Sequence, residues 1–483
     1  MSKVNRSYPK VELFIDGGWS PAVAGETLAV PNPATGEVIG TVAHARPTDL
    51  DRAIAAAERG FATWKATPAL ERARILRKAG SLLRERADEI ARLMTLEQGK
   101  IVAEAKGEVE RGADTCEWMA GEASRIYGRT IPARSANVTQ LVVKDPVGIV
   151  AAFTPWNFPI NQLVRKVLGA LAAGCAIVVK GPEETPACCA AMVQAFADAG
   201  VPAGALNLVF GTPAQISEYL VPHPSIRKIS FTGSTVVGKH LGSLAAQHMK
   251  LTTMELGGHA PVLVFADSDV EAAARALVGN KFRNAGQSCI NPTRLLVERP
   301  AYERFVKAFV EASRAIKVGE GFDPATTMGP LANPRRVQAM EALTADALAQ
   351  GAVLKLGGQR IGERGNFFAP TVLVDVPLTA RIMNEEPFGP LVPIRPFESF
   401  DEAIAEANRL PFGLSAYAFT ASHATAMQVA ARVESGMVSI NHFGLGNPEA
   451  PFGGLKDSGY GFEGGAEAIE AYLQPRFISF ADL

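Results

Sequence analysis

The sequence alternates between amphipathic segments with a period near 3.6 residues and short, continuously apolar runs. The helical period predicts helices at residues 51–64, after a helix-start signal at 47–49, and at residues 70–97. The apolar runs lie at residues 148–153, 176–179, 205–210, 261–265 and 293–297. A strand that helices cover on both faces must be apolar throughout, so this alternation predicts parallel sheets in an α/β protein.

The same rhythm restarts after residues 255–258, which indicates two α/β units. A chain of 483 residues is also too long for one ordinary core. A hairpin-like stretch at residues 131–147 and a strand at 476–480 fall outside this rhythm. The terminal strand alone would be an exposed apolar edge, so we expect it to pair with another element or with another subunit.

Composition narrows the class of protein. Lys and Arg number 48 against 49 Asp and Glu, so the net charge implies neither a nucleic acid nor a membrane surface as partner. The N-terminus has no apolar leader, and the longest apolar stretch, 167–179, is too short to span a bilayer. Five cysteines without a framework spacing fit a reduced, cytoplasmic protein, and the histidines show no metal-ligand spacing.

One thiol and one carboxylate stand out as candidate chemistry. Cys289 follows glycine and small polar residues, where backbone can approach it closely, and Glu255 lies among apolar residues before two glycines. A thiol nucleophile with a desolvated carboxylate favours covalent catalysis with a general base. The alternative is that Cys289 is a buried, inert thiol, which is common for free cysteine.

Polar residues follow three of the predicted strands, where ligands of doubly wound sheets bind. Asn157 offers an amide donor for an oxyanion, and Lys180 and Glu183 could bind ribose hydroxyls. Gly233 and Ser234 open a helix that could hold a phosphate. The alternatives are a turn residue, a solvated charge and a simple N-cap. No G-x-G-x-x-G follows the first strand, so a standard Rossmann site is not predicted.

Six motifs in this order resemble the NAD(P)-dependent aldehyde dehydrogenase superfamily over nearly the whole chain. They are TPWNFP (154–159), FTGS (231–234), MELGG (254–258), GQSC (286–289), EPFGP (386–390) and PFGG (451–454). The sequence is most similar to the semialdehyde branch, which acts on succinate semialdehyde or 2-oxoglutarate semialdehyde. GHAP (258–261) and KDSGYG (456–461) favour the second. Phe462 departs from the family, which commonly has Arg there.

The resemblance implies two doubly wound parallel-sheet domains and a small β element for oligomerisation. The cofactor-binding domain would comprise residues 1–128 and 148–256, and the catalytic domain residues 257–457. Residues 129–147 and 458–483 would form the oligomerisation element of a homodimer or homotetramer.

The resemblance also assigns roles. Cys289 would attack the aldehyde, Asn157 and the Cys289 backbone N–H would hold the oxyanion, and Glu255 would activate water. The positions expected to bind the cofactor are Thr154, Trp156, Lys180, Glu183, Gly211, Gly233, Ser234, Leu256, Glu386 and Phe388. A carboxylate at Glu183 would repel a 2′-phosphate, so we expect NAD, with NADP possible through Lys180. No metal is expected.

Two arginines match positions that hold the substrate carboxylate in succinate-semialdehyde dehydrogenases. These are Arg165 and Arg283, and Gln162 could add a donor to a carboxylate or a 2-oxo group. The loop at 442–449 lacks the Ser of the succinate pattern, which leaves the chain length of the substrate open. Alternatively, the arginines form structural salt bridges and the enzyme oxidises aromatic or simple aliphatic aldehydes. A non-enzymatic binding protein and a CoA-acylating enzyme are less favoured, because the motifs around Cys289 and Glu255 are both intact.

Overall fold

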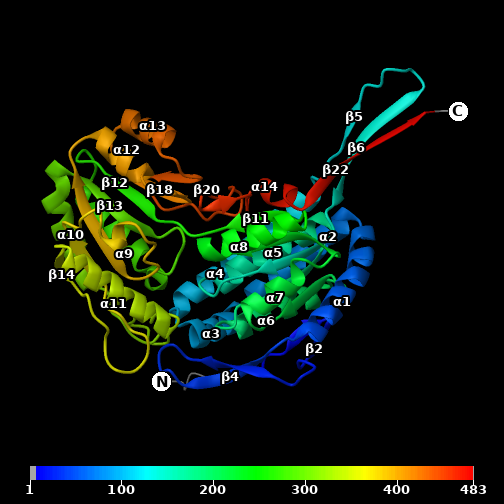
Figure 1. Cartoon of the computed structure of the whole chain (residues 1–483), viewed down its shortest axis with the longest axis horizontal. Helices are drawn as coiled ribbons and strands as arrows, with labels where there is room; N and C mark the ends of the chain where they lie inside the picture. Colours follow the sequence, from blue (N-terminus) through cyan, green and yellow to red (C-terminus); the bar gives the residue numbers. More distant parts are fainter. Residues whose placement is uncertain (1–6, 482–483) are drawn as a thin grey trace.

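The computed structural model describes residues 7–481, which form two large sheets and a projecting arm (Figure 1). The first sheet has eight strands in the order β2-β1-β9-β8-β7-β10-β11-β21. Its five central strands are parallel, and β1 and β21 add antiparallel strands on either side. The strands are β1 (Leu13–Ile15), β2 (Gly18–Ser20), β7 (Ile149–Phe153), β8 (Ala176–Lys180), β9 (Leu206–Val209), β10 (Ile226–Thr232), β11 (Leu251–Glu255) and β21 (Gly459–Tyr460).

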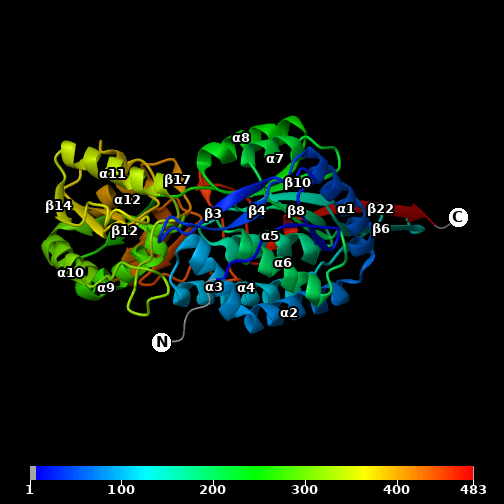
Figure 2. The ribbon, with the colours of Figure 1, turned by 90° about the horizontal axis from the view of Figure 1, so that it is seen from below.

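Helices cover both faces of this sheet. Figure 2 shows α7 and α8 on one face and α5 and α6 on the other, with α2 and α4 outside them. The helices are α1 (Pro47–Ala66), α2 (Ala69–Glu85), α3 (Ala87–Gln98), α4 (Val102–Ala123), α5 (Pro159–Ala173), α6 (Pro186–Ala199), α7 (Pro213–Leu220) and α8 (Thr235–Gln247). This layering explains why β7 and β8 are buried at every position.

The single helix predicted at residues 70–97 is wrong. The chain leaves helical geometry at Arg86, with φ −97° and ψ 9°, so α2 and α3 are separate helices. Both helices bury their apolar positions against α4 and α6. The apolar period therefore continues through the break and does not reveal it.

The second sheet has seven strands in the order β14-β15-β16-β13-β12-β18-β19, and all but β14 are parallel. The strands are β12 (Ala260–Val264), β13 (Pro292–Glu298), β14 (Val353–Leu356), β15 (Thr371–Val374), β16 (Leu391–Phe397), β18 (Ser415–Phe419) and β19 (Met437–Ile440). The helices around it are α9 (Val270–Lys281), α10 (Tyr302–Arg314), α11 (Pro334–Ala349), α12 (Phe400–Asn408) and α13 (His423–Arg432). This sheet has its own apolar cores, separate from the core of the first sheet.

A three-stranded sheet projects from the body as an arm (Figure 1). Strand β22 (Leu473–Ala481) pairs antiparallel with β6 (Val138–Pro146) along its full length, and β5 (Arg129–Ile131) pairs with the other side of β6. The predicted terminal strand thus has its partner within the same chain. Phe477 and Phe480 of β22 remain 57% and 49% exposed.

Short elements complete the fold: β3 (Thr27–Pro31) with β4 (Val38–Ala43), β17 (Phe412–Gly413) with β20 (Leu455–Lys456), α14 (Glu467–Glu470), and the 3-10 turns η1 (Arg283–Gly286), η2 (Arg299–Ala301) and η3 (Arg381–Met383). The parallel sheets predicted from the apolar runs are present, whereas the exact domain boundaries stay a prediction. Within residues 7–481, no helix is both long and apolar enough to cross a membrane.

Candidate active site

The loop that carries Cys289 is held in an unusual backbone conformation. Asn284 and Ala285 in η1 have φ of 51° and 52°, a left-handed region that non-glycine residues seldom adopt. The Asn284 side chain accepts a hydrogen bond from Gln98 Nε2 at 2.9 Å and donates one to the Asn157 carbonyl at 2.9 Å. These contacts join the loop to α3 and to the turn after β7, so they hold Cys289 in a fixed place.

Glycines let the neighbouring backbone approach this loop. A Cβ atom on Gly286 would lie 2.2 Å from the Gly389 carbonyl oxygen, and one on Gly258 would lie 2.7 Å from the Cys289 carbonyl oxygen. Neither position has room for a side chain. The second glycine after Glu255 therefore has a direct packing reason, since it touches the nucleophile loop itself.

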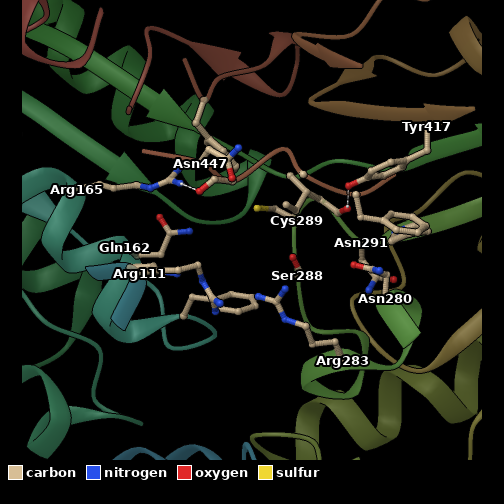
Figure 3. A pocket seen from close by; sticks show the side chains of 18 residues that line it. Arg111, Gln162, Arg165, Asn280, Arg283, Ser288, Cys289, Asn291, Tyr417 and Asn447 are labelled. Carbon is tan, nitrogen blue, oxygen red and sulfur yellow. Dashed lines mark hydrogen bonds between the residues drawn. The ribbon is translucent and has the colours of Figure 1, made fainter. Parts of the chain in front are cut away.

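Cys289 lines two cavities at once. The smaller cavity has a volume of about 230 Å³ and is lined by the predicted substrate-binding arginines, Arg165 and Arg283. The larger cavity has a volume of about 940 Å³ and is lined by residues expected to bind the cofactor. Figure 3 shows the Cys289 sulfur facing into the smaller cavity. Gln162 also lines both. Burial, with smaller contributions from Glu386 and Glu255 and against the opposing charge of Arg165, raises the pKa of the Cys289 thiol to about 12.

Asn157 and Glu255 reach this region from the carboxyl ends of two parallel strands. Asn157 follows β7, is 3% exposed, and donates a hydrogen bond from Nδ2 to the Gln287 carbonyl at 3.2 Å. Glu255 ends β11, is 2% exposed, and neither of its carboxylate oxygens has a hydrogen-bond partner among residues 7–481. Burial first, and then Glu463, raise the pKa of Glu255 well above its usual range.

A buried ion pair lies behind Glu255 and was not anticipated from the sequence. Lys166 of α5 pairs with Glu463 and donates a hydrogen bond to Thr232 Oγ1 at 2.7 Å. Glu463 directly follows Phe462, which is exposed. The segment around Phe462 therefore still contacts α5 through Glu463, although Phe462 stands where the family commonly has Arg.

The larger cavity gathers nearly all the positions expected to bind the cofactor. Its lining includes Thr154, Trp156, Lys180, Glu183, Gly233, Ser234, Leu256, Glu386 and Phe388. The exception is Gly211, which lies after β9 but does not line the cavity; Pro213, Ala214 and Ser217 of α7 do so instead.

Several contacts give this cavity its shape. Lys180 and Glu183 form an ion pair at 2.5 Å, and Ser234 caps α8 by accepting a hydrogen bond from Val237 N at 3.5 Å. Trp156 and Phe388 meet edge to face with centroids 5.6 Å apart. Burial raises the pKa of Glu386 to about 8. The cavity therefore offers a helix N-terminus, a charged pair and aromatic surface to a ligand.

The smaller cavity brings together Gln162, Arg165 and Arg283, as predicted, and adds Arg111 of α4, which the sequence analysis missed (Figure 3). Arg165 donates a hydrogen bond to the Gly446 carbonyl at 3.3 Å. Neither Arg165 nor Arg283 forms an ion pair with a carboxylate of residues 7–481, so the predicted alternative of structural salt bridges is not seen. Four aromatic side chains also line the cavity: Phe158, Tyr417, Phe443 and Phe452.

Comparison with known proteins extends these observations. The sequence model of the aldehyde dehydrogenase family matches residues 19–478. A 4-(hydroxymethyl)benzenesulfonate dehydrogenase of Comamonas testosteroni is 48% identical, over 97% of this chain and 98% of its own length. A 3-sulfolactaldehyde dehydrogenase of Pseudomonas putida is 43% identical, over 97% of this chain and 96% of its own.

A solved structure agrees. The crystal structure of succinate-semialdehyde dehydrogenase from Burkholderia pseudomallei superposes with a TM-score of 0.96 at 42% identity, covering 100% of both chains. The two-domain α/β fold and the family resemblance predicted from the motifs are thereby confirmed. The chain belongs to the aldehyde dehydrogenase family.

Proposed function

We propose that this aldehyde dehydrogenase oxidises an aldehyde that carries an anionic group to the corresponding acid, with NAD(P)+ and water. The observation that carries the proposal is the position of Cys289, which lines both the arginine-bearing cavity and the larger cavity. A substrate bound in the first and a cofactor bound in the second would meet at this sulfur.

The proposed reaction uses Cys289, Asn157 and Glu255 in turn. The Cys289 thiolate attacks the carbonyl carbon, and Asn157 Nδ2 with the Cys289 backbone N–H stabilise the oxyanion of the thiohemiacetal. When bound, the nicotinamide supplies the hydride acceptor. Loss of hydride from the carbon leaves a thioester on Cys289. Glu255 takes a proton from water, which attacks the thioester and releases the acid and the thiol.

The larger cavity fits a dinucleotide. Its volume of about 940 Å³ lies within the range of ligand sites, and Ser234 at the start of α8 offers backbone N–H groups and a hydroxyl to a phosphate. We assign Lys180 and Glu183 to the adenosine ribose. The Glu183 carboxylate would repel a 2′-phosphate, which favours NAD, and Lys180 would still tolerate NADP.

For the substrate, the finer proposal is a carboxylate-bearing semialdehyde, either 2-oxoglutarate semialdehyde or succinate semialdehyde. Arg165 and Arg283 lack carboxylate partners within residues 7–481, so they have donors to offer an anion. Gln162 is buried and lines the same cavity, so it can supply an amide for a carboxylate or 2-oxo oxygen.

An aromatic aldehyde is a second candidate, and the four aromatic residues of the smaller cavity favour it. An aromatic aldehyde with an anionic substituent would satisfy both the arginines and the aromatic side chains of the smaller cavity. The compound in the name of the Comamonas testosteroni relative, 4-(hydroxymethyl)benzenesulfonate, has an anionic substituent of this kind, a sulfonate on an aromatic ring.

A substrate panel with both cofactors tests the proposal. We expect NADH to form without added CoA, and kcat/KM to be higher for succinate semialdehyde, 2-oxoglutarate semialdehyde or 4-formylbenzenesulfonate than for benzaldehyde. The variant Cys289→Ala serves as the control and should form no NADH. Equal kcat/KM for benzaldehyde and every anionic aldehyde would refute the anionic substrate, and turnover by Cys289→Ala would refute the mechanism.

A further inference from the structure

The smaller cavity contains a third guanidinium group, that of Arg111, for which the proposed reaction has no use yet. Arg111 projects from α4, and Arg283 projects from η1. In Figure 3 these two side chains extend toward each other, while Arg165 points toward Asn447. Burial lowers the pKa of Arg111, and the charge of Arg283 lowers it further, so the two groups are electrostatic neighbours.

Among residues 7–481, no carboxylate lies within ion-pair distance of these two guanidinium groups. In the same part of the chain, neither the Arg111 nor the Arg283 guanidinium makes a hydrogen bond or an ion pair, although the Arg283 guanidinium lies 5.4 Å from the centroid of the Phe158 ring. The buried carboxylate of Glu108 is taken up by Lys100 and by the backbone N–H of Ile160, which donates at 2.9 Å. An unpartnered guanidinium pair in a cavity is a site for an anion.

A second carboxylate, that of the partly exposed Glu104, acts electrostatically on both arginines but is also engaged elsewhere. It accepts a hydrogen bond from the backbone N–H of Asn284 at 3.0 Å. Glu110, which also acts on Arg111, is exposed on the surface. Glu104 acts on both guanidinium groups and Glu108 acts on Arg111, but neither carboxylate forms an ion pair with them. Among residues 7–481, the N–H donors of both guanidinium groups are therefore left without acceptors.

Arg165 has a different environment. Its guanidinium donates to the Gly446 carbonyl, lies 4.3 Å from the centroid of the Phe452 ring, and lowers the pKa of both Cys289 and Glu255. Arg165 is therefore close to the reacting groups. Arg165 can therefore contact the anionic group of a substrate only from the side of Cys289, and Arg111 and Arg283 offer further donors to the same group.

We propose that Arg111 and Arg283 form a subsite for a pyramidal, three-oxygen anion, so that the enzyme prefers a sulfonated aldehyde to a carboxylated one. One guanidinium satisfies both oxygens of a planar carboxylate. A sulfonate has a third oxygen outside that plane, which a second guanidinium approaching from another element can bind. This proposal rests on the proposed oxidation of an anionic aldehyde, and it puts a sulfonate ahead of the carboxylate as the preferred anionic group.

Three aldehydes that share one ring separate the effects of charge and of oxygen number. They are 4-formylbenzenesulfonate, 4-formylbenzoate and benzaldehyde, assayed with the full chain and NAD. We expect the wild type to prefer the sulfonate to the carboxylate. Arg111→Gln should lower the ratio of kcat/KM between sulfonate and carboxylate about tenfold, mainly through KM of the sulfonate.

Two further variants keep the test interpretable. Arg111→Lys retains the charge and the long stem but loses the planar fork, so it should also lower the sulfonate-to-carboxylate ratio while both anions remain preferred to benzaldehyde. Lys106→Gln removes a charge from the exposed side of the same helix, where Lys106 pairs with Asp88, and should leave the ratio unchanged. Melting temperatures check that each variant is folded.

The outcomes separate this proposal from the proposed function. An unchanged ratio in both Arg111→Gln and Arg111→Lys, or a wild type that prefers the carboxylate, would overturn the subsite and leave the anionic-aldehyde function standing. A wild type with no preference for either anion over benzaldehyde would overturn both.

Discussion

At the scale of single residues, burial shifts both reacting groups of the site toward their neutral forms. Burial raises the pKa of Cys289 to about 12 and raises the pKa of Glu255 in the same direction. Only a thiolate is an effective nucleophile, and only a carboxylate acts as a base. Arg165 is the charge that opposes both shifts, so it links substrate binding to the reactivity of the site.

Alkylation of the thiol measures this effect directly. Cys289 is the partly exposed one of the five cysteines, whose other members are buried, so the rate of alkylation by iodoacetamide reports on it. We expect a slow rate at neutral pH that keeps rising into the alkaline range, because the raised pKa leaves little thiolate. Arg165→Met should slow the reaction at a given pH by several-fold or more.

The control for that experiment is Arg283→Met, which removes a guanidinium that lines the same cavity but is not among the charges with the largest effect on the pKa of Cys289. A wild-type rate that is already maximal at neutral pH would contradict the raised pKa. Equal slowing by both variants would show that Arg165 has no special relation to the thiol.

The pH profile of kcat tests the environment of Glu255. Turnover needs the ionised carboxylate, so kcat should rise with pH through the raised pKa of Glu255. Glu463 contributes to that raised pKa by repulsion, and Glu463→Gln removes the repulsion while leaving Lys166 in place. The variant should therefore shift the rising limb to lower pH, by up to about one unit.

Glu467→Gln, which changes an exposed carboxylate in the same segment, should leave the profile in place. A shift of the Glu463→Gln profile to higher pH would mean that Glu463 stabilises the ionised form of Glu255. That result would contradict the repulsion described above.

Sequence analysis could single out candidate residues that lie within local motifs. It could not single out residues that come together only through tertiary contacts. Cys289, Glu255 and Asn157 stand beside glycines or at strand ends, so their surroundings were readable. Arg111 is an ordinary polar position on a helix until α4 is packed beside η1. The Lys166–Glu463 pair joins residues 297 positions apart, and no local signal marks either partner.

At the scale of elements, buried strands were easier to predict than helix ends. Strands β7 and β12 coincide with continuous apolar runs, as does β8 up to Lys180, because helices cover both of their faces. The break at Arg86 was missed because α2 and α3 bury the same side. The backbone changes direction there while the apolar period continues.

The arm formed by β22, β6 and β5 makes a prediction about assembly. Phe477 and Phe480 lie on a projecting sheet and remain about half exposed, which is unusual for large apolar side chains without a partner. We propose that the arm pairs copies of the chain into a homodimer or homotetramer. Replacing both residues with Ser should reduce the mass measured by light scattering toward that of one chain, 51.1 kDa.

Val353→Ser and Leu354→Ser on β14 provide a matched pair of exposed apolar positions on another sheet edge, and they should leave the mass unchanged. A wild type with the mass of a single chain would contradict the proposed role of the arm. So would an oligomer that the Phe477→Ser, Phe480→Ser variant leaves intact.

At the scale of the whole molecule, the two sheets with separate cores leave two cavities that meet at one sulfur. The first sheet brings Glu255 and Asn157 to one edge, and the loop before β13 of the second sheet brings Cys289 to them. The larger cavity belongs mainly to the first sheet, and the arginines of the smaller one come from α4, α5 and η1. Catalysis therefore depends on how the units built on the two sheets pack against each other.

The most direct test of this account is the intact mass of the Glu255→Gln variant after it is mixed with NAD and 4-formylbenzenesulfonate. Without the base, the thioester should form faster than water hydrolyses it, so it should accumulate. The account predicts NADH release and a protein heavier by one 4-sulfobenzoyl group, which peptide mapping should locate on Cys289. NADH release with no adduct, or an adduct on any other residue, would contradict it.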